Sequence, residues 1–311
     1  MKVIIVGLGI QGNKRIKYLG RNLVATIDTY NKKADYKNIR DVPLNIFDAV
    51  FICTPDAEKY DLIKYSLKNK KHVLVEKPLW LGDLNKIKFL EKLAINNKVI
   101  LYVAYNHRFE PHIIKIKNLI LSKKLGKIYY CRMFYGNGTV KLVRKSKWKD
   151  KGLGVLSDLG SHLLDTCNFI FKDNDIGNFR IISANKFENS SYDHVTICNY
   201  KSKIHIELEM TYCFWKNNFT CDIVGEKGSA HIESLCKWGP SIFTYRKRIL
   251  PSGIPKEKKN LIKQKDPTWE MEYKYFKKLV NSKKRTNLSK DSWIFFHLSR
   301  LSNISKNNHN I

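Results

Sequence analysis

The first third of the chain alternates short apolar runs with longer polar stretches of helical period. The apolar runs are rich in Val, Ile and Leu and too short for helices, which predicts buried strands. Strands that alternate with helices form a parallel sheet. The predicted strands cover residues 2–6, 23–28, 49–53, 72–76 and 99–104, and the helices between the later ones cover about 58–70 and 83–97. The polar stretch 30–47 is short, so the crossover helix expected there is trimmed.

The pattern changes after about residue 105. One helix is predicted near 111–122 and another over "SDLGSHLLD" at 157–165. In "KIHIELEMTYCFW" at 203–215, apolar and polar residues alternate, which is typical of a strand with one wet face, and "GEKG" at 225–228 predicts a turn. We therefore predict an α/β protein with a parallel-sheet domain, 1–104, and an α+β domain, 105–311, whose open sheet is mainly antiparallel. A C-terminal helix around 289–302 is expected to pack back toward the first domain.

The chain has 311 residues and a formal net charge of +29. Such a charge attracts phosphate groups, which raises the question of nucleic-acid binding. The lysines are, however, scattered along the chain, and the densest runs are far apart and carry no nucleic-acid motif. We therefore expect no specific nucleic-acid partner. A basic surface still favours an anionic small substrate, although compositional bias explains the charge equally well.

No apolar run approaches the ~20 residues needed to cross a bilayer, and the N-terminal "MKVIIVGLGIQG" is too short and glycine-rich for a signal peptide. These features predict a soluble, cytoplasmic protein with no membrane partner. The seven cysteines form no C-x-x-C pair. They are expected to be small buried thiols, with neither a disulfide framework nor a metal site.

"GLGIQG" at 7–12 directly follows the first predicted strand and opens a helix. In this setting Gly7 permits a tight turn, Gly9 lets the backbone approach a pyrophosphate, and Gly12 lets the helix pack close to the strand. Ile10 and Gln11 lie at the start of the helix, where free N–H groups face phosphates. The pattern predicts a dinucleotide-binding (Rossmann) domain.

Asp28 ends the second predicted strand, about twenty residues further on, where an acid accepts hydrogen bonds from the ribose hydroxyls. A carboxylate there also repels a 2'-phosphate, so NAD is favoured over NADP. Asn31, Lys32 and Lys33 follow closely and keep NADP open as the alternative.

Two further motifs follow the third and fourth predicted strands. Thr54 and Pro55 come after the third, and "EKP", with Glu76 and Lys77, comes after the fourth. Ligands of open α/β sheets bind at these carboxyl ends. Proline after Lys77 biases the lysine to an extended conformation, which holds its ammonium near the crevice.

Three titratable residues recur at helical spacing in "SDLGSHLLD". Asp158, His162 and Asp165 form one stripe, while a neighbouring stripe of apolar residues is expected to face the core. The apolar stripe consists of Leu156, Leu159, Leu163, Cys167 and Ile170. One face of this helix packs, and the adjacent face can line a cavity.

Together these motifs resemble the glucose-fructose oxidoreductase/inositol dehydrogenase (Gfo/Idh/MocA) family, whose members join a Rossmann domain to an α/β domain with an open sheet. The resemblance rests on "GLGIQG", "ICTP", "KKHVLVEKPL", "YNHRFEP", "KDKGLGVLSDLGSHLLD" and "DIVGEKGSAHIE". It implies that Lys77, Asp158 and His162 form the catalytic group and that Asp165 touches the substrate. It also implies that Asn106 and Arg108 approach the cofactor and substrate, and that Trp148 lies near the nicotinamide.

The chain departs from the family pattern at two places. A histidine common shortly after the T-P pair is replaced by Lys59 or Tyr60, and a triple glycine before the catalytic helix reads Gly152, Leu153, Gly154. These departures bear on cofactor preference and pocket shape, and they leave the lysine, aspartate and histidine in place.

Oxidation of an alcohol removes the O–H proton as hydride leaves carbon, and a neutral imidazole suits the first task. We assign His162 as general base, Asp158 as the group that orients it, and Lys77 as the hydrogen-bond donor to the substrate oxygen. The predicted function is an NAD-dependent oxidoreductase acting on a secondary hydroxyl or keto group of a sugar, cyclitol or nucleotide-linked sugar.

Two alternatives remain at this stage. One is an NADPH-dependent reductase of a keto-sugar or another carbonyl compound. The other is a non-catalytic nucleotide-binding regulator or scaffold. The open sheet also predicts a homodimer or homotetramer that pairs through the C-terminal sheet.

Overall fold

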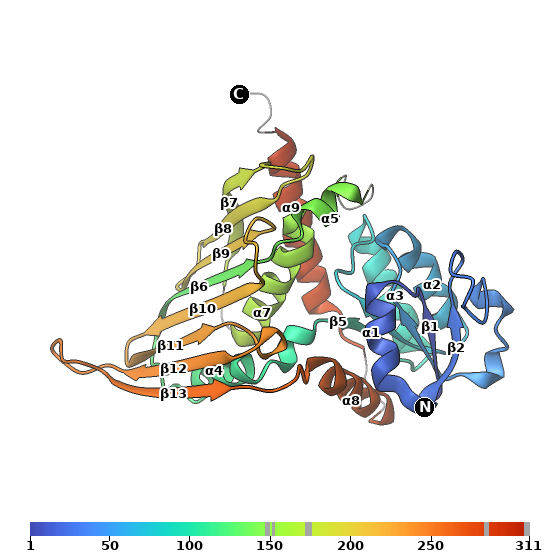
Figure 1. Cartoon of the computed structure of the whole chain (residues 1–311), viewed down its shortest axis with the longest axis horizontal. Helices are drawn as coiled ribbons and strands as arrows, with labels where there is room; N and C mark the ends of the chain where they lie inside the picture. The colour runs from blue at the N-terminus through green and yellow to red at the C-terminus, as the bar shows by residue number, and fades with distance from the viewer. Residues whose placement is uncertain (147–149, 151–152, 172–175, 283–285, 308–311) are drawn as a thin grey trace. The chain divides into compact units, whose positions relative to one another are not determined.

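The computed structural model describes residues 1–146, 150, 153–171, 176–282 and 286–307 (Figure 1). The chain forms two compact units. The first comprises Met1–Asn106 with Trp269–Phe295, and the second comprises His107–Thr268 with Phe296–Ile311.

The first unit contains a five-stranded sheet in the order β2-β1-β3-β4-β5, and all its strand pairs are parallel. The strands are β1 (Val3–Val6), β2 (Leu23–Ile27), β3 (Ala49–Ile52), β4 (His72–Glu76) and β5 (Leu101–Ala104). The helices are α1 (Ile10–Leu19), α2 (Asp56–Lys68) and α3 (Leu84–Asn96). Three of the strands are buried at every residue, as expected for a sheet covered on both faces. The predicted parallel α/β domain is confirmed.

The connection between β2 and β3 contains no α-helix. Two single 3₁₀ turns, Ile39–Asp41 and Leu44–Ile46, take its place. Asp35 ties this loop to β2 by accepting hydrogen bonds from the backbone N–H and the hydroxyl of Thr26, at 2.8 and 2.7 Å. The polar side chains of this segment thus form hydrogen bonds within a loop and do not make up the exposed face of a helix.

A helix from the far end of the chain completes the core of the first unit. In α8 (Thr268–Asn281), Phe276 is fully buried and packs edge-to-face against Phe51 of β3, with ring centroids 5.5 Å apart. Tyr273 contacts the same Phe51 ring. Aromatic pairs of this kind contribute about 0.5–1.5 kcal/mol beyond their burial.

The second unit contains an eight-stranded sheet in the order β13-β12-β11-β10-β6-β9-β8-β7. Among the described strand pairs of this sheet, β6–β9 is parallel and the remaining pairs are antiparallel. The strands are β6 (Ile128–Gly136), β7 (Asn178–Asn185), β8 (His194–Tyr200), β9 (His205–Thr211), β10 (Asn218–Gly225), β11 (Gly228–Glu233), β12 (Ser241–Lys247) and β13 (Lys256–Ile262). The predicted open, mainly antiparallel sheet is confirmed.

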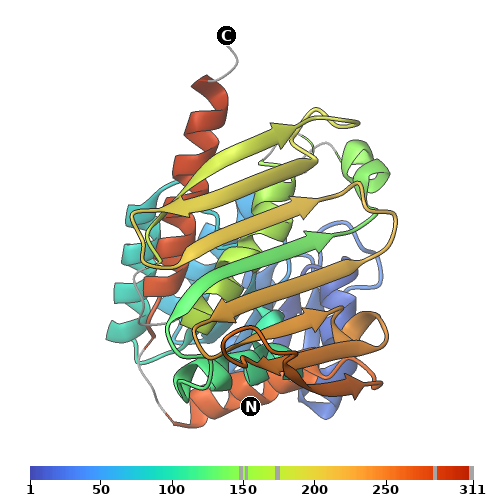
Figure 2. The same cartoon turned by 90° about the vertical axis from the view of Figure 1, so that its left-hand side faces the viewer.

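One face of this sheet carries helices and the other does not (Figures 1 and 2). The helices of the second unit are α4 (Pro111–Leu121), α5 (Val140–Lys145), α7 (Ser161–Phe171) and the later part of α9 (Ser289–Asn307). Alternation along β9 decides which side chains face them: Ile206, Leu208 and Met210 are fully buried, while His205 is exposed. Among the described residues, the opposite face bears no helix and is open to solvent.

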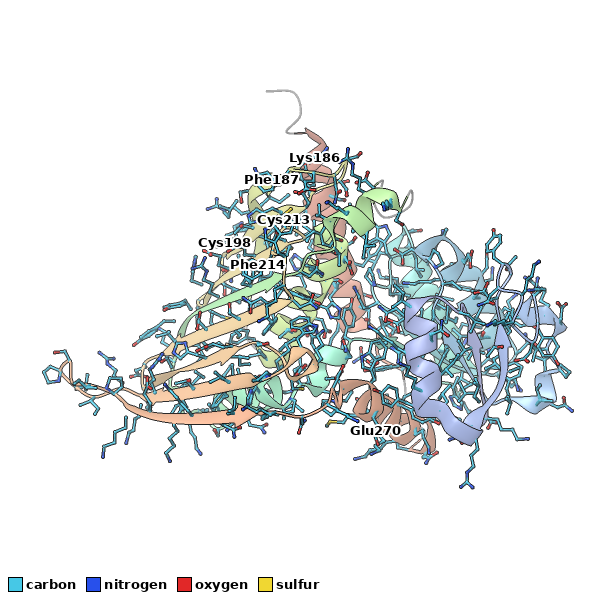
Figure 3. All side chains as sticks on the ribbon, in the orientation of Figure 1. Lys186, Phe187, Cys198, Cys213, Phe214 and Glu270 are labelled. Carbon is cyan, nitrogen blue, oxygen red and sulfur yellow. The ribbon has the colours of Figure 1, made fainter. Side chains whose placement is uncertain are left out.

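All seven cysteines are free thiols. Cys198 on β8 and Cys213 after β9 are labelled in Figure 3, and the side chain of Glu270 on α8 is labelled there too.

Within the described ranges, no helix combines the length and hydropathy that a membrane span requires.

Candidate active site

The glycine loop between β1 and α1 has the geometry that its sequence predicts. Gly7 has a φ of +94°, which a residue with a side chain rarely adopts. A Cβ on Gly12 would lie 2.0 Å from the carbonyl oxygen of Gly7, so only glycine permits this approach of helix and loop. A Cβ on Gly9 would meet nothing within 4 Å, and Gly9 itself is exposed. The loop therefore closes tightly on the protein side and stays open on the solvent side.

The start of α1 is suited to an anion. Its first turn carries no acidic residue, and Ile10 at its first position is 75% exposed. The first N–H groups of a helix have no partner within the helix and carry a partial positive charge. Among the described residues, the buried atoms Gln11 Oε1 and Thr54 Oγ1 have no hydrogen-bond partner. These groups fit a bound dinucleotide whose phosphates lie over the loop.

Asp28 follows β2 and is fixed by the neighbouring backbone. Its Oδ2 accepts a hydrogen bond from the N–H of Leu8 at 2.8 Å, and its Oδ1 accepts from Tyr30 and Asn31 at 2.9 and 2.8 Å. Burial alone would raise the pKa of Asp28, but these hydrogen bonds outweigh it and lower the pKa. The carboxylate is thus ionised and held beside the glycine loop.

Lys77 follows β4 and is partly exposed. The preceding residue, Glu76, is 8% exposed, and its carboxylate accepts a hydrogen bond of 2.6 Å from Nε of Arg15. Arg15 also donates to Glu272 of α8 at 2.9 Å. Burial would lower the pKa of Arg15, but the two glutamates outweigh it and raise the pKa. Glu76, predicted to contact the cofactor, therefore uses its side chain to hold α1, and Lys77 extends from a fixed strand end.

The predicted cofactor residues of this unit share one edge of the sheet. The glycine loop follows β1, Asp28 follows β2, Thr54 and Pro55 follow β3, Glu76 ends β4 and Lys77 follows it, and Asn106 comes shortly after β5. Because the strands are parallel, their carboxyl ends all lie at this edge. The strand order reverses between β1 and β3, and such switch points are where ligands of open α/β sheets bind.

In the second unit, Asp158 precedes α7 and His162 lies in its first turn, so the two residues do not share one regular α-helix. Leu156–Gly160 is a π-helical turn, and α7 begins only at Ser161. The α-helical spacing expected between Asp158 and His162 therefore does not apply. A Cβ on Gly160 would lie 2.7 Å from the sulfur of Met210, so glycine lets this turn press against β9. Turns of this type occur frequently at functional sites.

His162 is 7% exposed and surrounded by rings. The ring of His107 stacks on it with centroids 4.2 Å apart and an interplanar angle of 21°. Tyr135 of β6 approaches it edge-on at 5.9 Å. Nε2 of His107 lies 2.7 Å from Nζ of Lys237, so His107 accepts a hydrogen bond from the ammonium as a neutral ring.

Asp158 faces a phenol from the sheet. The hydroxyl of Tyr212 donates to Oδ2 of Asp158 at 3.2 Å. Burial and then the charge of Asp158 raise the pKa of Tyr135 and the pKa of Tyr212. Both phenols are therefore protonated across the physiological range, and the buried Tyr212 is the one that donates to the carboxylate.

Arg108 and Asp165 form a nearly buried ion pair. Nε of Arg108 lies 3.0 and 2.9 Å from the two carboxylate oxygens, and its Nη2 contacts Oδ1 as well. The side chain of Asp165 is 1% exposed and that of Arg108 is 15% exposed. Of the two side chains, only that of Arg108 keeps some exposed surface.

The structure adds residues that sequence reasoning missed. His107 lies within the quoted "YNHRFEP" motif and was visible there, but nothing in the sequence assigned it to His162. Tyr135, Tyr212 and Lys237 carry no local signal, since they come from separate strands and a turn. The predicted residue Trp148 lies outside the described residues. No group of three His, Cys, Asp or Glu side chains in the described part of the chain could hold a metal ion.

Two family models match the chain. A model described as "Oxidoreductase family, NAD-binding Rossmann fold" matches residues 1–105, and one described as "GFO/IDH/MocA C-terminal domain" matches residues 113–231. The two matches coincide with the parallel sheet and with much of the open sheet, and together they cover more than half of the chain.

Curated relatives and solved structures agree with these matches. The chain is 32% identical to an uncharacterized oxidoreductase of Schizosaccharomyces pombe over 40% of this chain and 34% of the relative. It is 22% identical to glucose-6-phosphate 3-dehydrogenase of Bacillus subtilis over 69% of this chain and 67% of the relative. In the first matches, the chain spans a third to a half of the relative's length. An oxidoreductase of Agrobacterium radiobacter, crystallised with NAD+, L-tartaric acid and magnesium, shares the fold with a TM-score of 0.79 at 16% identity, over 99% of this chain and 97% of that chain.

The ion pair of Arg108 and Asp165 predicts a non-additive mutant cycle. Asp165→Leu alone leaves a poorly hydrated guanidinium without its carboxylate, which typically costs about 3–5 kcal/mol in the free energy of unfolding. Arg108→Met combined with Asp165→Leu removes both charges and should cost less than the sum of the single variants. Urea unfolding of the four proteins measures this difference, and strictly additive losses would show that the pair is not coupled.

Proposed function

Since this chain belongs to the Gfo/Idh/MocA oxidoreductase family, we propose that it transfers a hydride between NAD and a secondary hydroxyl or keto group of a sugar-like substrate. The observation that supports this most strongly is the shared sheet edge of the first unit. There the glycine loop, Asp28, Thr54 and Lys77 follow four neighbouring parallel strands.

The first unit would hold the dinucleotide through backbone and side-chain groups of this edge. The start of α1, at Ile10 and Gln11, binds the pyrophosphate. Its backbone N–H groups face the phosphates, and Gly9 has no side chain to block their approach. Asp28 accepts hydrogen bonds from the ribose hydroxyls, and Thr54 and Asn106 contribute polar groups further along the edge. NAD, when bound, would accept the hydride from the substrate.

The chain's own residues handle the proton and the developing charge. Lys77 donates a hydrogen bond to the substrate oxygen and stabilises the negative charge that builds up as its proton leaves. His162 accepts that proton, and Asp158 stabilises the protonated ring. The alcohol thus loses a hydride from carbon to the cofactor and a proton from oxygen to His162, and it becomes a ketone. In the reverse direction, Lys77 polarises the carbonyl and His162 returns the proton.

Substrate recognition is assigned to Arg108 and Trp148. Asp165 acts through Arg108, because its carboxylate is committed to the guanidinium. A guanidinium and a net charge of +29 favour a substrate with a phosphate or another anionic group. The name of the Bacillus subtilis relative, a glucose-6-phosphate 3-dehydrogenase, supports the same class. Sugar phosphates, cyclitols and nucleotide-linked sugars are therefore the substrates to test.

Removal of either proposed catalytic side chain should abolish turnover without abolishing nucleotide binding. Lys77→Ala and His162→Ala are each expected to lower kcat by about 100-fold or more, because each removes a group that acts in the transition state. NADH production with the best substrate of the panel measures kcat, and fluorescence titration measures NADH affinity. Lys92→Ala, at an exposed lysine on α3, is the matched control.

The same panel, tested also as keto compounds with NADH and NADPH, separates the alternatives. A non-catalytic regulator would bind NADH tightly and turn over no member of the panel. A carbonyl reductase would show activity only with NADPH and a keto substrate. Near wild-type kcat in either variant would overturn the assigned roles.

Asp28 is expected to set the choice between NAD and NADP. Its carboxylate, kept ionised by three backbone hydrogen bonds, accepts from ribose and repels a 2'-phosphate. Asp28→Ser should weaken NADH binding by about tenfold, as for loss of a hydrogen bond to a charged group, and should strengthen NADPH binding. Asp61→Ser on the exposed side of α2 is the control. An unchanged affinity ratio would place the cofactor preference elsewhere.

We further propose that the helix-free face of the eight-stranded sheet pairs with a second copy of the chain. Tyr130 is 43% exposed on this face, and Arg132 bridges Glu207 at 3.1 Å and Glu209 at 3.4 Å. A two-fold pair uses the same patch on both partners. Light scattering should give two or four times 36.4 kDa, and Tyr130→Asp should reduce this mass. Tyr30→Asp in the first unit is the control, and a wild-type monomer would reject the pairing.

A further inference from the structure

We propose that Lys59 is a positioning residue for Lys77. Its buried ammonium holds the backbone on both sides of Lys77 and thereby orients that side chain toward the substrate oxygen. This inference rests on the proposed function, because it gives Lys59 its importance through the role of Lys77.

The contacts of Lys59 bracket Lys77 in the sequence. Nζ of Lys59 donates to the carbonyl oxygen of Glu76 at 2.7 Å and to the carbonyl oxygen of Pro78 at 2.8 Å. These carbonyls belong to the residues immediately before and after Lys77. A single ammonium in the first turn of α2 therefore fixes the two ends of the peptide segment that carries the lysine.

The third proton of the ammonium is also used. Nζ lies 2.7 Å from Oδ1 of Asp56, one turn earlier in α2. An ammonium has three donors and no acceptor, so these three oxygens satisfy it completely. Lys59 is 2% exposed, and a charge at that depth persists only when it is paired and hydrogen-bonded. Burial lowers the pKa of Lys59, and Asp56 opposes this effect.

The chemistry of the site explains why a lysine suits this position. The two carbonyl oxygens and the carboxylate oxygen surround one point, and a compact ammonium placed there can donate to all three. A neutral imidazole has one N–H and could serve only one of these three acceptors. The clamp therefore depends on the three N–H donors of the Lys59 ammonium.

The chain contains a matched control for the clamp. Nζ of Lys71 also donates to two backbone carbonyls, those of Leu44 and Phe47, at 2.7 and 2.8 Å. Lys71 directly precedes β4, whereas the clamp of Lys59 lies where β4 ends. Lys71→Met thus removes the same kind of interaction in the same unit, away from Lys77.

The test compares Lys59→Met and Lys71→Met in two measurements. In the cofactor-free protein, trace labelling with acetic anhydride and mass spectrometry gives the acylation rate of Lys77 relative to exposed Lys92. This relative rate should change by about threefold or more in Lys59→Met, because release of the segment alters the exposure of the Lys77 amine, and not in Lys71→Met. In turnover assays, kcat of Lys59→Met should fall by about 10- to 100-fold, because small misplacements of a catalytic group cost rate.

Binding of NADH to Lys59→Met should stay within about threefold of wild type, since the clamp acts on a group used in the transition state. If Lys59→Met does not fold, Lys59→Arg retains the charge, but its planar fork fits the three divergent acceptors poorly. It should show the same changes in labelling and kcat, to a smaller extent. A folded Lys59 variant with wild-type labelling of Lys77 and wild-type kcat would overturn the proposal. If the wild-type protein turns over no substrate, the proposed function fails, and labelling of Lys77 still decides whether the clamp exists.

Discussion

The buried guanidinium of Arg15 is the interaction on which the first unit depends. It lies in α1 directly after the glycine loop, and it joins Glu76, the residue before Lys77, to Glu272 of α8. Removing one partner of such a buried cluster typically costs about 3–5 kcal/mol, because a charge is left without compensation. One cation thus connects the helix after the glycine loop, the end of β4 and the helix that returns from the far end of the chain.

The carboxyl end of β4 is held from two sides. Arg15 binds the carboxylate of Glu76, and Lys59 binds its carbonyl oxygen. The segment that carries Lys77 is therefore held by contacts within the protein itself. In the second unit, buried rings have the comparable role: His107 and Tyr135 pack around His162, and Tyr212 donates to Asp158.

Much of the fold and part of the site could be predicted from local patterns. The five strands of the parallel sheet, the trimmed crossover after β2, the buried apolar stripe from Leu156 to Ile170 and the alternation along β9 follow from periodicity and were confirmed. The positive φ at Gly7 and the close approach at Gly12 follow from the limits of backbone geometry. The π-helical turn before α7 did not follow, because an α-helical pattern of apolar residues is compatible with either turn.

The sequence alone determined the two kinds of sheet, the glycine loop and the identity of the motif residues, since these depend on neighbours within a few positions. Only the tertiary structure decided the partners of the buried charges. Arg15 meets Glu76 across 61 residues and Glu272 across 257, and Lys59 meets the carbonyl of Glu76 across 17. In a lysine-rich chain no local signal marks one cation as buried, because burial and pairing arise only when distant elements pack together.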